Sequence, residues 1–196
     1  MVYAVRLRNW ARRPLSMPCP DHWPAGQPDL IGLTQEAVDI AERSADDFAL
    51  GFALATMGVA LVERNAAAAD RGLQLLRQVR EMSVGDRFYR VHVPLINAWI
   101  GRGVARCGDR DGALPVLRSA NDDLFAGGQF GHCTATTRLL VQELLVDSDE
   151  SGVREAEAAI ERLAAVQTSQ GPNLSSGLGD LAMCPGGFFA VEGVVS

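Results

Sequence analysis

The chain has 196 residues, of which 47% are hydrophobic, 21% charged and 6% aromatic. This composition excludes a disordered or membrane-embedded chain, and the length fits one ordinary domain. The low aromatic content, together with abundant Ala and Leu, favours helices over a β-sandwich. The formal net charge of −6 argues against nucleic acid as a direct partner.

The four cysteines, Cys19, Cys107, Cys133 and Cys184, lie far apart and form no C-x-x-C pair. Two of them fall within helical patterns, where Cys behaves as a small apolar residue. This usage predicts a reduced, cytoplasmic protein. No run reaches the ~18 apolar residues that a membrane-spanning helix needs, so we expect no membrane as a partner.

Composition divides the chain into three zones. Residues 1–32 are rich in proline, which excludes a continuous helix because each proline removes a donor and clashes with the preceding turn. Residues 33–168 carry helical hydrophobic patterns. Residues 169–196 are rich in Gly, Ser and Pro. We therefore expect an irregular leader, one helical domain and a flexible tail.

Capping residues and glycine stops divide the middle zone into seven helices. Their expected bounds are about 34–44, 46–62, 70–82, 91–107, 109–126, 134–146 and 152–166. Asp47 and Asp111 are alternative starts of the second and fifth helices. The run from Asn65 through the following alanines is expected to link the second helix to the third. Pro94 and Pro115 fall in the first turns of their helices, where a missing N–H costs little.

The first two of these helices differ in how they should be buried. The first carries the apolar stripe Ala37, Ile40, Ala41 and Ala45, for which the sequence shows no evident partner. The second is apolar nearly all round, which predicts burial between neighbouring helices.

A recurring pattern of small and large residues is the strongest signal in the chain. A large-then-small pair, Ile100-Gly101, is followed by Val104 one turn later, and a Gly-Asp turn comes next. The second helix then shows small, large and small residues at Ala113, Leu117 and Ala120. This pattern resembles the tetratricopeptide repeat (TPR), in which small residues let two helices approach closely and large ones fill the gaps.

A second copy of the pattern lies upstream. Its matching positions are Met57-Gly58, Leu61, Gly72, Leu76 and Val79. Helix 34–44 and the helix at 152–166 resemble partial copies. We therefore expect an all-α fold of antiparallel helical hairpins, stacked as a short TPR-like α-solenoid with irregular N- and C-terminal segments.

Four groups of short strings carry a closer resemblance. They are 44–50, 58–62 with 77–82, 109–113 with 122–125, and 154–164. Together they resemble the C-terminal helical region of large multidomain regulators from high-GC bacteria, in which a class III adenylate/guanylate cyclase is joined to an ATPase module, some with a LuxR-type DNA-binding end. The resemblance covers about 33–166. It implies a setting in nucleotide signalling or transcriptional control, with cyclase, ATPase or regulator domains as partners.

The catalytic motifs of that family are missing from this chain. There is no Gly-x-x-x-x-Gly-Lys string, and no Lys at all to reach a phosphate. Nothing resembles a cyclase core or a helix-turn-helix. We therefore expect a non-catalytic module for protein–protein or interdomain contact, or for self-association. The alternative is a truncated remnant of such a regulator without independent function.

Arg102 and Arg106 are the candidate binding residues. Being four positions apart, they share one face of the first helix of a repeat, and first helices line the concave side of such arrays. They are expected to hold an acidic peptide segment, with solvation or internal pairing as the alternative.

No catalytic, metal or cofactor site is expected. His132 and Cys133 are adjacent, but a metal site needs more ligands at short spacing. A small enzyme using Cys133 or His92 is a distant alternative, since the sequence marks no third group to orient them.

Overall fold

The computed structural model describes residues 30–85, 88–147 and 149–169. These residues form seven α-helices and one short 3-10 turn, with no strand among them. The elements are α2 (Leu30–Ser44), α3 (Asp47–Arg64), α4 (Ala66–Val84), η2 (Arg90–His92), α5 (Val93–Arg106), α6 (Arg110–Ala126), α7 (Phe130–Leu144) and α8 (Glu150–Ser169). The predicted all-α fold class is confirmed. The predicted leader up to residue 29 and the tail from residue 170 lie outside the described residues.

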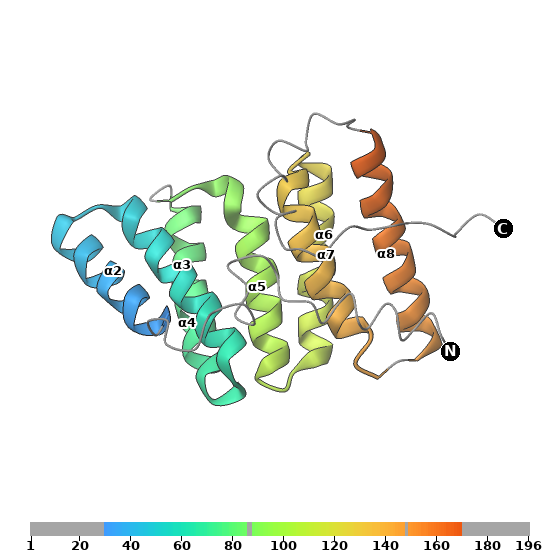
Figure 1. Cartoon of the computed structure of the whole chain (residues 1–196), viewed down its shortest axis with the longest axis horizontal. Helices are drawn as coiled ribbons and strands as arrows, with labels where there is room; N and C mark the ends of the chain where they lie inside the picture. The colour runs from blue at the N-terminus through green and yellow to red at the C-terminus, as the bar shows by residue number, and fades with distance from the viewer. Residues whose placement is uncertain (1–29, 86–87, 148, 170–196) are drawn as a thin grey trace, which may run out of the picture.

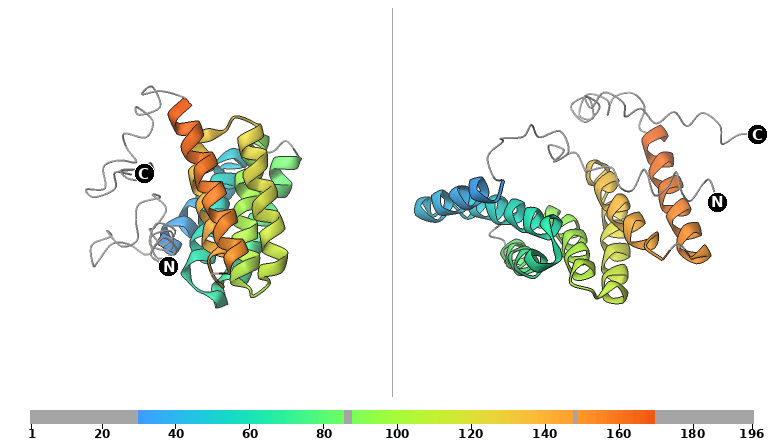
Figure 2. Two further views of the ribbon diagram at one scale, coloured as in Figure 1. Left: turned by 90° about the vertical axis from the view of Figure 1, so that its right-hand side faces the viewer. Right: turned by 60° about the horizontal axis from the view of Figure 1, so that its bottom comes forward.

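The helices form a row in chain order from α2 to α8 (Figure 1). Each helix contacts the next one along the chain, and α5 also contacts α3 and α7. Successive helices alternate in direction because the connections are short; Asn65 alone joins α3 to α4. The right-hand view in Figure 2 shows the same order from α2 to α8.

Side-chain caps determine where several helices begin. Asp46 accepts hydrogen bonds from the N–H groups of Phe48 and Ala49 at 3.0 and 3.1 Å, which confirms the predicted start of α3. Asp109 caps α6 in the same way through the N–H of Gly112 at 2.9 Å.

Several predicted bounds were wrong. The Oδ1 atom of Asn65 accepts from the N–H of Ala68 at 2.8 Å, so the alanine run is the first turn of α4 and not a connection. Asp149 likewise caps α8 through Gly152 at 2.6 Å, which moves its start to residue 150. α2 begins at Leu30 instead of 34, and α7 at Phe130 instead of 134. Pro115 lies inside α6, beyond the first turn, whereas Pro94 is at the start of α5 as predicted.

The backbone turns left-handed at three helix ends. Gly108 and Gly128 have φ values of +98° and +65°, which confirms the predicted glycine stops after α5 and α6. Ala45, between α2 and α3, has a φ of 53° although it carries a Cβ. An L-residue in this conformation is strained relative to glycine.

We expect Ala45→Gly to raise the free energy of unfolding by about 0.5–1 kcal/mol, because glycine removes this strain. Urea unfolding followed by circular dichroism measures the change. The matched control is Ala158→Gly, an exposed position in the middle of α8, which should lower the same free energy by about 1 kcal/mol. An equal loss of stability in both variants would contradict the assignment of strain to Ala45.

Two helical hairpins pack through the same contacts. A Cβ placed on Gly58 of α3 would lie 2.9 Å from Cγ of Leu76 and 3.1 Å from the carbonyl oxygen of Gly72, both in α4. A Cβ on Gly101 of α5 would lie 2.9 Å from Cγ of Leu117 and 3.4 Å from the carbonyl oxygen of Ala113, both in α6. The positions matched in the two sequence copies therefore occupy equivalent places in the two hairpins.

The face that α2 buries differs from the prediction. Thr34, Val38 and Ala41 are buried, and α2 packs against α3, so the helix does have a partner. Ala37 and Ala45 are exposed, and Ile40 is 53% exposed. α2 carries apolar residues on more than one face, and the position of α3 decides which face is covered.

Candidate interaction surface

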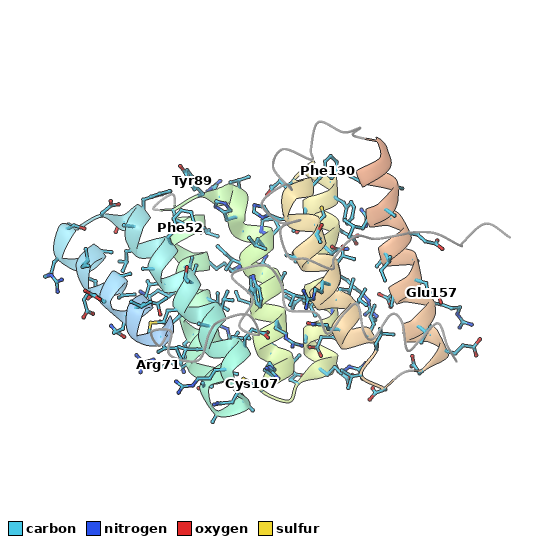
Figure 3. The ribbon with its side chains drawn as sticks, viewed as in Figure 1. Phe52, Arg71, Tyr89, Cys107, Phe130 and Glu157 are labelled. Atoms are coloured by element: carbon cyan, nitrogen blue, oxygen red, sulfur yellow. The ribbon has the colours of Figure 1, made fainter. Side chains whose placement is uncertain are left out.

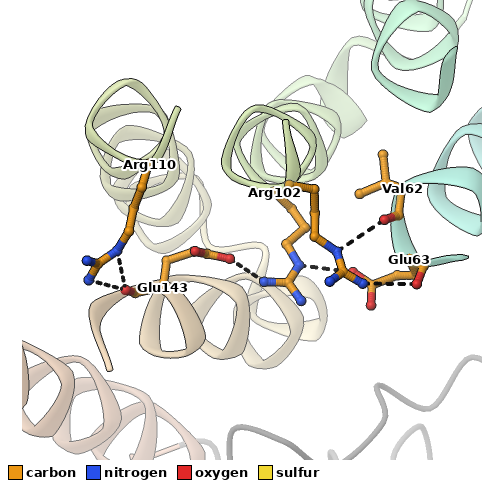
Figure 4. A network of polar contacts seen from close by, with 6 residues as sticks. Val62, Glu63, Arg102, Arg110 and Glu143 are labelled. Carbon is orange, nitrogen blue, oxygen red and sulfur yellow. Dashed lines mark hydrogen bonds and ion pairs between the residues drawn. The ribbon is translucent and has the colours of Figure 1, made fainter. Parts of the chain in front are cut away.

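Arg102 lies between the carboxylates of two helices that flank its own. Its Nε donates to Oε1 of Glu63 in α3 at 3.0 Å, and one terminal nitrogen contacts Oε1 of Glu143 in α7 (Figure 4). The Arg102 side chain is 14% exposed and that of Glu143 only 6%. Burial by itself lowers the pKa of Arg102, but the two carboxylates outweigh it and the pKa is raised. Arg102 therefore links α3, α5 and α7 as a charged group.

Two further arginines bond to backbone carbonyls at helix ends. Arg106 donates to the carbonyl oxygens of Val62 and Glu63, at 3.3 and 3.0 Å. Arg110 donates twice to the carbonyl oxygen of Glu143, at 2.9 and 2.6 Å (Figure 4). These carbonyls belong to the last turns of α3 and α7, where the regular intrahelical bonding ends; that of Glu143 also accepts from the N–H of Val146 at 3.4 Å.

The predicted binding residues are thus both engaged within the chain. An acidic peptide at Arg102 would compete with Glu63 and Glu143, and one at Arg106 would compete with the end of α3. Binding of an acidic segment by Arg102 and Arg106 stays a prediction, while the observed contacts are those of internal pairing.

Cys133 lies in the interior, next in sequence to His132 of α7. The Cys133 side chain is buried, and its Sγ lies 3.6 Å from the carbonyl oxygen of Gln129. Burial raises the pKa of the thiol, against the opposing effect of Arg162. A nucleophilic cysteine requires the opposite, a lowered pKa. Among the described residues, no group of three or more His, Cys, Asp or Glu side chains is arranged to hold a metal ion.

Four aromatic side chains and one histidine lie together near the first turns of α3 and the residues that precede α5. Phe48 lies 5.0 Å from Phe52 and 4.8 Å from Tyr89 between ring centroids, both in edge-on arrangements. Phe88 lies 5.1 Å from Phe52 and 5.9 Å from His92. Figure 3 shows Phe52 and Tyr89 near one another at one end of the helices. We call this cluster, Phe48, Phe52, Phe88, Tyr89 and His92, the aromatic edge.

Much of the aromatic edge is open to solvent. Phe48, Phe52 and Tyr89 are 42%, 46% and 51% exposed, whereas Phe88 beneath them is 8% exposed. Val91, in η2, is a further exposed apolar residue. Large apolar groups gathered on a surface in this way mark interaction sites in soluble proteins more often than isolated exposed residues do.

Local features of the sequence place these rings. Phe48 and Phe52 are four positions apart and so share one face of α3. Gly51 between them makes room for Phe88, since a Cβ there would lie 2.5 Å from its Cδ2 atom. Tyr89 immediately precedes the turn η2, and its ring contacts that of Phe48 near the start of α3. The prediction that this helix is buried between its neighbours was wrong at Phe48 and Phe52.

His92 of the aromatic edge, the last residue of η2, lies next to His132 of α7. Their ring centroids are 5.7 Å apart, and Nδ1 of His92 is buried without a hydrogen-bond partner. Burial lowers the pKa of His92, and His132 lowers it further; burial also lowers the pKa of His132. Both imidazoles are therefore neutral at pH 7, and the edge is an aromatic surface with little charge of its own.

We expect these two histidines to make the fold less stable in mild acid. In the unfolded chain each has a pKa near 6.5, and in the folded chain the pKa is lower. The histidine contribution to stability is thus complete above about pH 6.5 and declines as the pH falls from there through the folded-state pKa values. Urea unfolding between about pH 7.5 and pH 5 measures this decline.

The comparison is with a His92→Phe, His132→Phe variant, which retains the carboxylates that also titrate in acid. The native chain should lose more stability than the variant over this pH range. Equal losses would show that the imidazoles do not carry the effect.

An open groove of about 590 Å³ lies between α4, α5 and α6. It is lined by Arg77, Arg80 and Glu81 among others, and Nε of Arg80 donates to Oδ1 of Asn97 at 2.9 Å. Its charges are of both signs, and it holds no arrangement of nucleophile, base or convergent donors.

Within the described part of the chain, no helix is both long and apolar enough to cross a lipid bilayer. Comparisons of the chain with protein-family models, with curated proteins and with solved structures each found no match.

Proposed function

We propose that this chain is a non-catalytic, TPR-like interaction module whose docking surface is the aromatic edge. The observation that carries the proposal is the exposure of Phe48, Phe52 and Tyr89 as one contiguous group. Aromatic side chains supply large contact areas at a small cost in side-chain entropy, and they are frequent anchors in protein interfaces.

The matching contacts of the two hairpins support the TPR-like part of the proposal. Gly58 meets α4 as Gly101 meets α6, at the positions where the two sequence copies correspond. Helices that contact mainly their chain neighbours are the arrangement expected of a repeat array.

The resemblance of 33–166 to the helical region of cyclase- and ATPase-linked regulators suggests the setting. In that setting the partner is a protein domain of a nucleotide-signalling or transcriptional regulator in the cytoplasm. The chain then provides a surface for protein contact and catalyses no reaction itself.

Site-specific photo-crosslinking in the producing cells tests the proposal. A benzophenone side chain replaces Tyr89 in one variant and Val146 in another; Val146 is 61% exposed and lies at the connection between α7 and α8. We expect a defined protein adduct from position 89 that is absent at position 146. The adduct should weaken when Phe52→Ser is added.

Identical adducts from both positions, or none from position 89, would contradict the aromatic edge as a docking surface. A chain that forms no adduct at any exposed position would instead favour the alternative of a remnant without independent function.

A further inference from the structure

We propose that the aromatic edge binds the proline-rich stretch 14–20 of its own chain. This inference rests on the proposed function of the edge as a docking surface and names the segment that covers the edge when no partner is bound. The stretch, Pro-Leu-Ser-Met-Pro-Cys-Pro, lies outside the described residues and enters the argument only through its sequence and its distance along the chain from α2.

The chemistry of the segment 14–20 matches that of the aromatic edge. Proline-rich segments favour an extended polyproline II form and bind surfaces lined with aromatic rings, at a low entropic cost because that form is already populated. Phe48, Phe52 and Tyr89 present such rings. Pro14, Pro18 and Pro20 have no N–H, so the segment has few donors that would need an acceptor from the aromatic side chains of the edge.

The absence of charged side chains distinguishes residues 14–20 from the residues that flank them. Residues 14–20 contain no ionisable group except the thiol of Cys19, whereas residues 6–13 contain four arginines and residue 21 is an aspartate. The histidine at the edge is neutral at pH 7, since burial and the neighbouring His132 lower the pKa of His92. An uncharged segment therefore avoids the desolvation of ionic groups on binding.

Residue 20 is near enough along the chain to reach the aromatic edge of the same molecule. Phe48 follows closely on the C-terminal end of α2, so Leu30 and the edge are separated by roughly the length of that helix. α2 has 15 residues, and a helix of that length spans about 22 Å. Residues 21–29 in an extended polyproline form would span about 28 Å, which suffices to bring residue 20 to the edge. Pro24 and Pro28 are too near Leu30 to arrive there.

Paramagnetic relaxation in the full chain tests the contact. Cys107→Ser and Cys184→Ser leave Cys19 as the site for a nitroxide label, because Cys133 is buried. We expect the ring signals of Phe52 and Tyr89 to lose most of their intensity with the oxidised label and to regain it on reduction. Val146, at the connection between α7 and α8, should change little.

A second label position guards against a nitroxide that itself blocks the contact. Ser16→Cys combined with Cys19→Ser should give the same pattern. Pro18→Ala with Pro20→Ala should remove most of the broadening, whereas Pro24→Ala with Pro28→Ala should retain it.

Four results would overturn the inference. The first is equal broadening at the edge and at Val146 for both labels. The second is broadening that the substitutions at Pro18 and Pro20 leave unchanged. The third is broadening that appears only when a labelled copy is mixed with a separate isotope-enriched copy, which would make a second molecule the occupant. Crosslinking from position 89 to an outside protein, without broadening from either label, would overturn this inference and leave the proposed function standing.

Discussion

Gly72→Ala is expected to lower the free energy of unfolding by about 2–3 kcal/mol, at the upper end of the range for overpacked interiors. A Cβ at this position in α4 would lie 2.6 Å from the carbonyl oxygen of Gly58 and 2.9 Å from the backbone nitrogen of Val62, both in α3. Backbone atoms cannot turn aside as a side chain can, so α3 and α4 would have to move apart. Urea unfolding followed by circular dichroism measures the loss.

Gly131→Ala is the matched control for this substitution. Gly131 lies in α7, and no neighbouring atom is within 4 Å of a Cβ built there. Replacing an exposed helical glycine by alanine should raise the free energy of unfolding by about 0.4–1 kcal/mol. A loss of similar size in both variants would mean that helix packing at Gly72 does not limit the substitution.

Arg102→Met is expected to cost about 3–5 kcal/mol of unfolding free energy, the range for breaking one side of a buried ion pair. The substitution leaves the Glu143 carboxylate, whose side chain is 6% exposed, without its arginine. Glu63 is 43% exposed and is left hydrated, so it contributes little to the loss. Thermal and urea unfolding report the change.

The double variant Arg102→Met, Glu143→Gln separates charge from packing. Removing both charges should recover most of the lost stability, because no unpaired ion then remains buried. Arg110 still has the backbone carbonyl of residue 143 to bond. Arg154→Ala, which breaks the exposed pair with Glu150, should cost no more than about 0.5 kcal/mol. A double variant as unstable as Arg102→Met would show that the arginine acts through its packing.

Most of the helices could be predicted because their signals are local. Asp46 and Asp109 cap helices within three residues of themselves, and Gly108 and Gly128 turn the chain immediately after α5 and α6. The start of α4 after Asn65 also depends on a local signal, although the predicted start was residue 70. The Asn65 side chain caps α4 through the N–H of Ala68, and the alanines that follow are strong helix formers.

The buried faces of α2 and α3 were harder to predict. α2 carries apolar residues both at Val38 and Ala41, which are buried, and at Leu33 and Ile40, which are exposed. Helical periodicity shows which residues share a face, but the neighbouring helix decides which face is covered. The same ambiguity concealed the exposed rings of Phe48 and Phe52 in a helix that is apolar on nearly all sides.

The sequence by itself determined the all-helical class, most of the helix ends and the small residues at which paired helices approach. These depend on contacts within a helix or between a helix and the next one. Only the tertiary structure decided that Arg102 lies between Glu63 and Glu143, which are 39 and 41 positions away, and that Phe48 meets Tyr89. The physical reason is that the hydrophobic pattern of a helix indicates only the face that the helix itself buries. Contacts between distant side chains depend on how α3, α5 and α7 pack against one another. Arg102 and Arg106 are consequently paired within the chain, whereas Phe48, Phe52 and Tyr89 are exposed.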